Sequence, residues 1–311
     1  MTAPLHGVLP ILHTPFDDHD SIDRSALREE IDWVYYVGAQ GVCSAMVSEI
    51  LRLTEDERVL LTELMVQFSD GRGAVVASVG SESTKQAVEY ARVAQSAGCT
   101  AIMAIPPISA ALPEASLRSY FSTIADAVEL PLIVQDASSY VGKAMSPAFL
   151  ASLLDAYGPE KIQFKPEASP LGPNLSALRD ATQGRAKIFD GSGGLLLVDA
   201  YRRGLTGTMP GCDVLDAVVV LWKALETNNE SVIRQIAPLI GSVIALQLQA
   251  GLDGFLAIEK YLMVKRNLFA TARRRAPTAW DLDRETAQEV DRLFADLNNA
   301  LATLEPELAS K

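Results

Sequence analysis

A lysine stands where a buried strand is expected to end. Lys165 directly follows the apolar run at 162–164 and directly precedes Pro166. Low-dielectric surroundings disfavour an ammonium group, so a lysine in such a place has a lowered pKa. A neutral amine near pH 7 attacks a ketone and forms a Schiff base, an electron sink for making or breaking the adjacent carbon–carbon bond. The alternative is a surface lysine whose stem covers apolar area.

Schiff-base chemistry also needs a proton shuttle within about 3 Å of the reacting atoms. His13 is one candidate, because it follows Ile11 by two residues, so both side chains should point to the same side of a strand. If Ile11 faces the interior, His13 faces the site, and histidine titrates near neutral pH. The alternative is a strand-end histidine that is hydrogen-bonded to a loop carbonyl.

Two further segments carry residues that suit a binding site. Gly191 lies in "FDGSGG", where small residues and free amides at a strand-to-helix turn can hold an anion, although glycines are also common there for steric reasons. Tyr140 follows the apolar run "LPLIVQD" and could stack on a substrate or donate a hydrogen bond to it. The alternative for Tyr140 is a loop tyrosine that covers the core.

Eight short apolar runs alternate with helical patterns along the first three quarters of the chain. They show no clean apolar–polar alternation, which is typical of strands buried on both faces of a parallel sheet. Eight strand–helix units in about 230 residues predict an α/β fold, a closed (β/α)8 TIM barrel. The alternative is an open doubly wound sheet, but "LHTPFDD" after the first run is not the Gly-rich turn of that fold. The runs begin at residues 7, 41, 74, 100, 130, 161, 186 and 207.

The last part of the chain has only helical periodicity. One apolar face runs from Ile233 to Leu246, a second from Ile258 to Val264 and a third from Val290 to Leu304. The sequence therefore predicts a barrel over residues 1–228, which holds the active site, and a C-terminal extension of three helices over residues 229–311.

Composition limits the classes of partner. The net charge is -12, from 39 acidic and 27 basic residues, which argues against nucleic acid and anionic membranes. The N-terminus lacks the pattern of a signal peptide, and no uninterrupted apolar stretch is long enough to span a bilayer, so we expect a cytoplasmic protein. The three cysteines, Cys43, Cys99 and Cys212, are not spaced like the ligands of a metal site. We expect them to be buried residues of a protein in a reducing compartment. No cofactor is expected.

Six segments, in order and spacing, carry a resemblance over nearly the whole chain. They are "HTPFDDHDSID", "AMVSEILRLTEDER", "PLIVQDASSYVGKAMSP", "QFKPEASP", the pair "FDGSGG" and "GLTGTMPG", and "APTAWDLDRETAQEVDRLFADL". Together they resemble the dihydrodipicolinate synthase / N-acetylneuraminate lyase family, Schiff-base aldolases built on a barrel with a helical C-terminal extension. The resemblance implies that Lys165 forms the imine, that Gly191 and Thr208 line the pocket, and that the protein is a homotetramer or homodimer.

The chain also departs from the family at the positions that handle protons and carboxylates. Gln135 stands in place of the tyrosine that relays protons on the fifth strand. The motif of small residues that holds the pyruvate carboxylate is here Met46 and Val47, with Ser48 as the next polar residue. Tyr140 stands where synthases often carry an arginine for a second carboxylate. The acceptor or leaving fragment is therefore not expected to be a simple acid.

These residues predict an enzyme, a carbon–carbon lyase of the class I aldolase type that acts on pyruvate or a related 2-keto acid through Lys165. Gln135 and His13 are its further catalytic candidates, and Val47, Ser48, Tyr140, Gly191 and Thr208 would bind the substrate. The alternatives are a 2-keto acid dehydratase of the same family and a barrel that binds a keto acid or sugar acid without turning it over. A metal-dependent aldolase is disfavoured, because the three histidines lie in one short segment.

Overall fold

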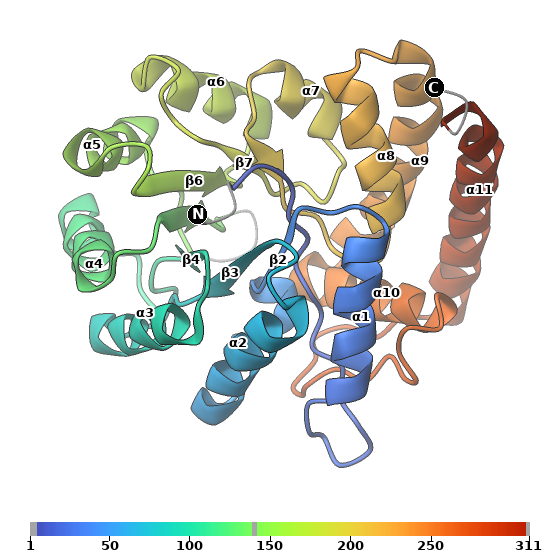
Figure 1. The fold of residues 1–311 in the computed structure, drawn as a ribbon, viewed down its shortest axis with the longest axis horizontal. Coiled ribbons are helices and arrows are strands. Elements are labelled where there is room, and N and C mark those ends of the chain that lie inside the picture. The colour runs from blue at the N-terminus through green and yellow to red at the C-terminus, as the bar shows by residue number, and fades with distance from the viewer. Residues whose placement is uncertain (1–4, 139–141, 309–311) are drawn as a thin grey trace.

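Eight short parallel strands lie at the centre of the molecule (Figure 1). The computed structural model describes residues 5–138 and 142–308. Strands β2 to β6 pair in chain order into one arc, and β7, β8 and β1 form a second arc. Bridges between Phe164 and Ile188 and between Ile11 and Cys43 join the arcs, so the strands form a ring. The strands are β1 (Gly7–Val8), β2 (Gly41–Cys43), β3 (Ala74–Ser78), β4 (Ala101–Ala104), β5 (Leu132–Asp136), β6 (Ile162–Pro166), β7 (Phe189–Asp190) and β8 (Gly207–Thr208).

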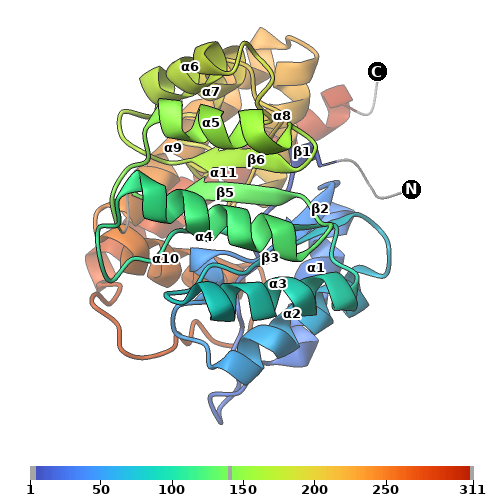
Figure 2. The ribbon, with the colours of Figure 1, turned by 90° about the vertical axis from the view of Figure 1, so that its left-hand side faces the viewer.

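Helices cover the outside of this ring, as expected for a (β/α)8 barrel. Figure 2 shows α3, α4 and α5 side by side in front of the strands. The covering helices are α1 (Arg24–Tyr36), α2 (Glu55–Ser69), α3 (Thr84–Ala97), α4 (Glu114–Ala127), α5 (Pro147–Tyr157), α6 (Leu171–Ala181), α7 (Leu197–Arg202) and α8 (Leu215–Glu226). The predicted fold class is therefore confirmed.

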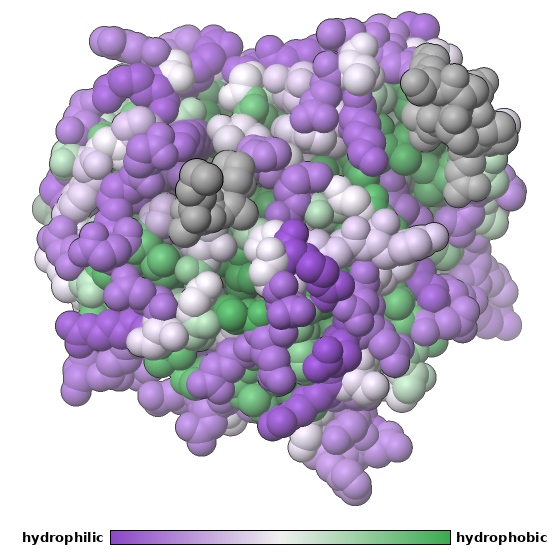
Figure 3. Space-filling model, in the orientation of Figure 1, coloured by the Kyte–Doolittle hydropathy of each residue, from purple (hydrophilic) through white to green (hydrophobic). Residues whose placement is uncertain are grey.

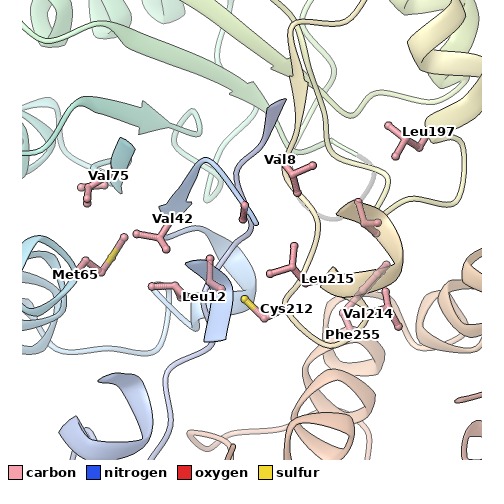
Figure 4. Packing of buried hydrophobic residues seen from close by; sticks show 14 of the residues in the cluster. Val8, Leu12, Val42, Met65, Val75, Leu197, Cys212, Val214, Leu215 and Phe255 are labelled. Carbon is pink, nitrogen blue, oxygen red and sulfur yellow. The ribbon is translucent and has the colours of Figure 1, made fainter. Parts of the chain in front are cut away.

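Alternate residues of each strand face two different cores. Val42 and Val75 pack outward against the helices, in the cluster shown in Figure 4. Their neighbours Cys43, Ala74 and Val76 point into the ring and fill a smaller inner core. Both faces of the strands are apolar for this reason, which explains why the sequence shows no alternation.

Local signals set the ends of several helices. Thr54 and Glu57 form a capping box at the start of α2, with each side chain bonded to the other residue's backbone N–H. Ser146 caps α5, and Pro147 is its first residue. Ser83 precedes α3 but makes no side-chain cap hydrogen bond.

Three C-terminal helices follow the barrel, as predicted. They are α9 (Glu230–Leu248), α10 (Gly251–Lys265) and α11 (Arg284–Leu308), and they lie together beside α8 (Figure 1). Among the described residues, only α9 is long and apolar enough to cross a membrane by length and composition. It packs against α8, α10 and α11, and its buried face includes Ile236, Ile240 and Val243.

The connection between α10 and α11 is held by ion pairs of its arginines. The guanidinium group of Arg275 contacts both oxygens of Glu57, at 2.9 Å and 2.8 Å. Arg274 is largely buried and pairs with Asp281, with Nη2 and Oδ1 2.6 Å apart. Glu57, the partner of Arg275, lies on a distant part of the chain, which spacing does not reveal.

Candidate active site

A cavity opens at the carboxyl ends of the strands, where barrels of this type hold their active sites. Residues from both arcs and from α10 line it. Residues on both sides of the domain boundary predicted at 228/229 line this one cavity. The boundary itself stays a prediction. The lining residues are Ile11, Ala45, Met46, Val47, Gln135, Lys165, Glu167, Gly191, Gly193, Met209, Gly211, Leu252, Phe255 and Glu259.

Lys165 lines this cavity and is paired with a carboxylate. Its Nζ atom lies 3.0 Å from Oε1 of Glu167, and both side chains are buried. The two residues lie two apart at the end of β6, and side chains two apart on a strand share a face. Apolar walls alone were expected around Lys165, and Glu167 is an additional, charged neighbour. A proton on this amine can therefore pass directly to Glu167.

Glu167 is suited to accept and return that proton. Burial raises the pKa of this carboxyl above its usual range, and the charge of Lys165 opposes that shift. Oε2 of Glu167 accepts a hydrogen bond of 2.6 Å from Nε2 of Gln135. Gln135 thus orients the carboxylate, and its own Oε1 has no hydrogen-bond partner among the described residues.

Gly191 lines the cavity beside Glu167, and its lack of a side chain is required there. A Cβ atom at this position would stand 2.5 Å from Oε1 of the glutamate. Thr208 does not reach the cavity, contrary to the expectation. Its hydroxyl donates to Oδ2 of Asp190 at 3.2 Å, and the next residue, Met209, lines the cavity instead. Neighbours on a strand point to opposite faces, and this decides between the two.

The segment after β2 contributes Val47 but not Ser48. Ser48 is fully buried and donates its hydroxyl to the carbonyl of Leu12, while its oxygen accepts from the N–H of Ala45 at 3.1 Å. The expectation that Ser48 binds substrate is therefore not met by its position. The turn of residues 46–48 stands at the cavity, and the first N–H groups of such a turn lack partners within it.

His13 lies behind the cavity rather than in its lining. Although Ile11 lines the cavity as expected, the histidine is fully buried between two carboxylates. Nδ1 of His13 lies 3.0 Å from Glu30, and Nε2 lies 2.9 Å from Glu259. Burial alone would lower the pKa of His13, but the hydrogen bonds and charges of Glu259 and Glu30 outweigh it and raise the pKa to about 10. An imidazolium is therefore held there, which does not fit a shuttle that touches the substrate.

His13, Glu30 and Cys212 carry ligand-type atoms within 4.8 Å of one another. Because both ring nitrogens of His13 already contact carboxylates, this group reads as a charge-compensated cluster rather than a metal centre. Tyr140, predicted to bind substrate, lies outside the described residues.

Sequence reasoning missed two carboxylates of this site. The spacing of Lys165 and Glu167 was a usable signal, since residues two apart at a strand end share a face. Glu259 had no such signal, because it reaches the cavity from α10, 94 positions farther along the chain than Lys165.

Comparison with known proteins gives one consistent family. Residues 4–219 match the model of the dihydrodipicolinate synthetase family. An L-2-keto-3-deoxyarabonate dehydratase from Azospirillum brasilense is 29% identical over 231 residues, which cover 72% of this chain and 74% of the relative. A 4-hydroxy-tetrahydrodipicolinate synthase from Methanopyrus kandleri is 35% identical over 159 residues, 50% of this chain and 53% of the synthase. The match to this synthase thus spans about half its length.

The fold agrees with solved structures over nearly the whole chain. The prophage protein YagE from E. coli K12, of the dihydrodipicolinic acid synthase family and solved in complex with pyruvate, superposes with a TM-score of 0.85. The superposition covers 95% of this chain and 99% of YagE at 20% identity. At this identity the likeness supports the fold.

Proposed function

The chain belongs to the dihydrodipicolinate synthetase family, and we propose that it removes water from a 2-keto-3-deoxy acid bound as an imine to Lys165. The family and its relatives make this protein a Schiff-base lyase or dehydratase for pyruvate-type keto acids. Its members include aldolase-type carbon–carbon lyases, as the sequence predicted. The choice of dehydration within this class is the proposal.

The pairing of Lys165 with Glu167 is the observation that carries the proposal. Among the described lining residues, the only ionisable side chains are those of Lys165, Glu167 and Glu259, and none of these described residues bears a hydroxyl. Elimination needs a base at C3 of the substrate and an acid at the hydroxyl on C4. A buried carboxyl of raised pKa, 3.0 Å from the amine that becomes the imine nitrogen, can take the first proton and supply the second.

The proposed reaction balances as follows. Lys165 gives its proton to Glu167, and its amine adds to the C2 carbonyl. Glu167 returns the proton to the carbinolamine hydroxyl, which leaves as water, so that a protonated imine and a free carboxylate remain. A base removes one proton from C3, and the resulting enamine expels the C4 hydroxyl as water once that oxygen is protonated. Water then hydrolyses the imine, which releases the dehydrated keto acid and the free lysine. The net change is the loss of one water molecule.

The relative from Azospirillum brasilense supports the substrate class, since its name describes dehydration of a 2-keto-3-deoxy sugar acid. Aldol cleavage or condensation is the second candidate, and the match to a synthase favours it. Cleavage breaks the C3–C4 bond and needs a base at the C4 hydroxyl, the task that the family resemblance assigns to a tyrosine where this chain has Gln135.

Borohydride trapping tests the imine, and product analysis tests the reaction. We expect pyruvate and 2-keto-3-deoxypentonates to add covalent mass to the peptide that holds Lys165. Lys165→Met should abolish the adduct and the activity, whereas Lys187→Met, which removes an amine paired with Glu160 at the surface, should keep both. Dehydrated keto acid as the product supports the proposal, and pyruvate with an aldehyde would assign aldol cleavage instead. A folded wild-type protein without an adduct would contradict the imine.

The assembly and the compartment belong to the same proposal. The family resemblance supports a homotetramer or a homodimer, and light scattering of the purified protein measures which one forms. The reducing compartment inferred from the three cysteines fits the described structure, where all three are unpaired and buried. A cytoplasmic location is the proposal, and fractionation of the native cell tests it.

A further inference from the structure

A second carboxylate faces the cavity from outside the barrel. Glu259 lies on α10, and its side chain is almost completely buried. Its Oε2 atom contacts His13, but its Oε1 atom accepts no hydrogen bond from the described residues. A Cβ at Gly211 would stand 2.6 Å from that Oε1 atom, so the glycine leaves the oxygen free space. Because Glu259 lines the cavity and this oxygen has no donor among the described residues, it is suited to a donor on a bound molecule.

His13 fixes the position of this carboxylate. The imidazole lies between Glu30 and Glu259, 3.0 Å from one and 2.9 Å from the other, and is fully shielded from water. As an imidazolium it donates to both, which holds the side chain of Glu259 in one orientation at the cavity. Because His13 does not line the cavity, it acts through Glu259 and is a positioning residue.

We propose that Glu259 binds a hydroxyl group on the tail of the substrate and selects 2-keto acids whose tails are hydroxylated and uncharged. This inference rests on the proposed function and deepens it. A hydroxyl that donates to a buried carboxylate forms a short, strong hydrogen bond. A tail that ends in a carboxylate meets Glu259 and Glu167 instead, and the described lining contains no arginine to pair with it. Like charges at short range in a low dielectric repel strongly, so such tails are rejected.

Three keto acids that differ only in the tail test this directly. They are a 2-keto-3-deoxy acid with a hydroxyl on its terminal carbon, the analogue without that hydroxyl, and the analogue with a terminal carboxylate. We expect kcat/KM of the wild-type enzyme for the hydroxylated acid to exceed that for either analogue by ~10²-fold or more. Equal values for all three would overturn the inference.

Variants assign the preference to Glu259. Glu259→Gln should reduce the preference to within ~10-fold, mainly through a higher KM for the hydroxylated acid, and pyruvate, which has no tail, should still be trapped on Lys165. His13→Gln should act in the same direction, and Glu63→Gln, on the exposed face of α2, is the control and should change nothing. If Glu259→Gln does not fold, the double variant His13→Gln/Glu259→Gln is measured in its place, because it removes two opposite charges together.

The outcomes separate this inference from the proposed function. If Glu259→Gln lowers kcat/KM equally for the hydroxylated and unhydroxylated acids, Glu259 does not select the tail. If the wild-type protein forms no pyruvate adduct on Lys165, the proposed function itself is overturned.

Discussion

At the scale of single residues, Lys165 and Glu167 divide the proposed chemistry between them. The lysine supplies the covalent bond and the glutamate moves the protons, although the two side chains form one ion pair before the substrate arrives. Substitution separates the two tasks, because imine formation with pyruvate and turnover of a longer keto acid are different measurements.

Glu167→Gln should preserve the imine and impair turnover. The amide keeps the size of the side chain but cannot take a proton, so we expect kcat for dehydration to fall ~10²–10⁴-fold. Trapping of pyruvate on Lys165 should still occur, measured by intact mass after borohydride. Glu160→Gln, on the exposed segment just before β6, is the matched control. A variant at Glu167 that keeps the wild-type kcat would show that another group moves the proton.

At the scale of elements, α10 is attached to the barrel through a buried ion pair. Lys260 on this helix pairs with Glu49, which follows the turn at 46–48, and both side chains are fully shielded. The ammonium also donates to the carbonyls of Thr14, at 2.7 Å, and of Arg273, at 2.8 Å. One lysine thus ties α10 to the ends of two strand segments and to the connection before α11. This attachment keeps Glu259, one residue earlier, at the cavity.

Lys260→Met should destabilise the protein strongly. It leaves Glu49 buried without its cation, a change that costs about 3–5 kcal/mol of unfolding free energy in comparable cases. Urea titration followed by circular dichroism measures the loss. The double variant Lys260→Met/Glu49→Gln should regain part of the stability, because no uncompensated charge remains. Lys265→Met, which breaks a half-exposed pair with Asp291, should cost less than about 1 kcal/mol. Equal losses for the two single variants would contradict this role of Lys260.

At the scale of the whole molecule, the acidic surface and the buried charges have different consequences. Figure 3 shows polar residues over most of one face, with apolar residues between them. The net charge of -12 favours solubility and is screened by salt. The buried cluster around His13 is not screened in this way. The pKa of its histidine is raised in the folded protein, so the cluster links the stability of the fold to pH.

Stability should fall as the pH rises above about 6.5. The pKa of His13 is raised from 6.5 to about 10 in the folded protein. Its contribution to the free energy of unfolding is therefore complete below pH 6.5 and is lost as the pH rises through 10. A single proton gives a slope of about 1.4 kcal/mol per pH unit within that window. Burial and the charge of Glu259 raise the pKa of Asp213 to about 7. The contribution of Asp213 to stability is therefore also lost as the pH rises, between about 4 and 7.

Urea unfolding between pH 7 and 9 measures the share of His13. The unfolding free energy of the wild-type protein should decline across this range, and His13→Gln should show a clearly smaller slope. The difference between the two slopes isolates the histidine from tyrosines and thiols that titrate at higher pH. Parallel slopes would mean that the imidazole is not protonated in the folded state.

The sequence by itself determined the barrel, the three C-terminal helices and the place of Lys165. Those features depend on local patterns: apolar runs buried on both faces, helical periodicity, and a lysine at a strand end. It also located Gly191, Val47 and Gln135, which line the cavity. It did not determine the direction in which each side chain points. Thr208 and Ser48 point away from the cavity, whereas their sequence neighbours Met209 and Val47 line it.

Only the tertiary structure decided which charges meet. Glu259 reaches the cavity because α10 packs over the barrel mouth, and His13 lies beneath it because Glu30 and Glu259 approach from two different helices. No periodicity in the chain encodes a contact between residues 13 and 259, which are 246 positions apart. A buried charge is stable only beside its partner, and that partner is chosen by packing rather than by spacing.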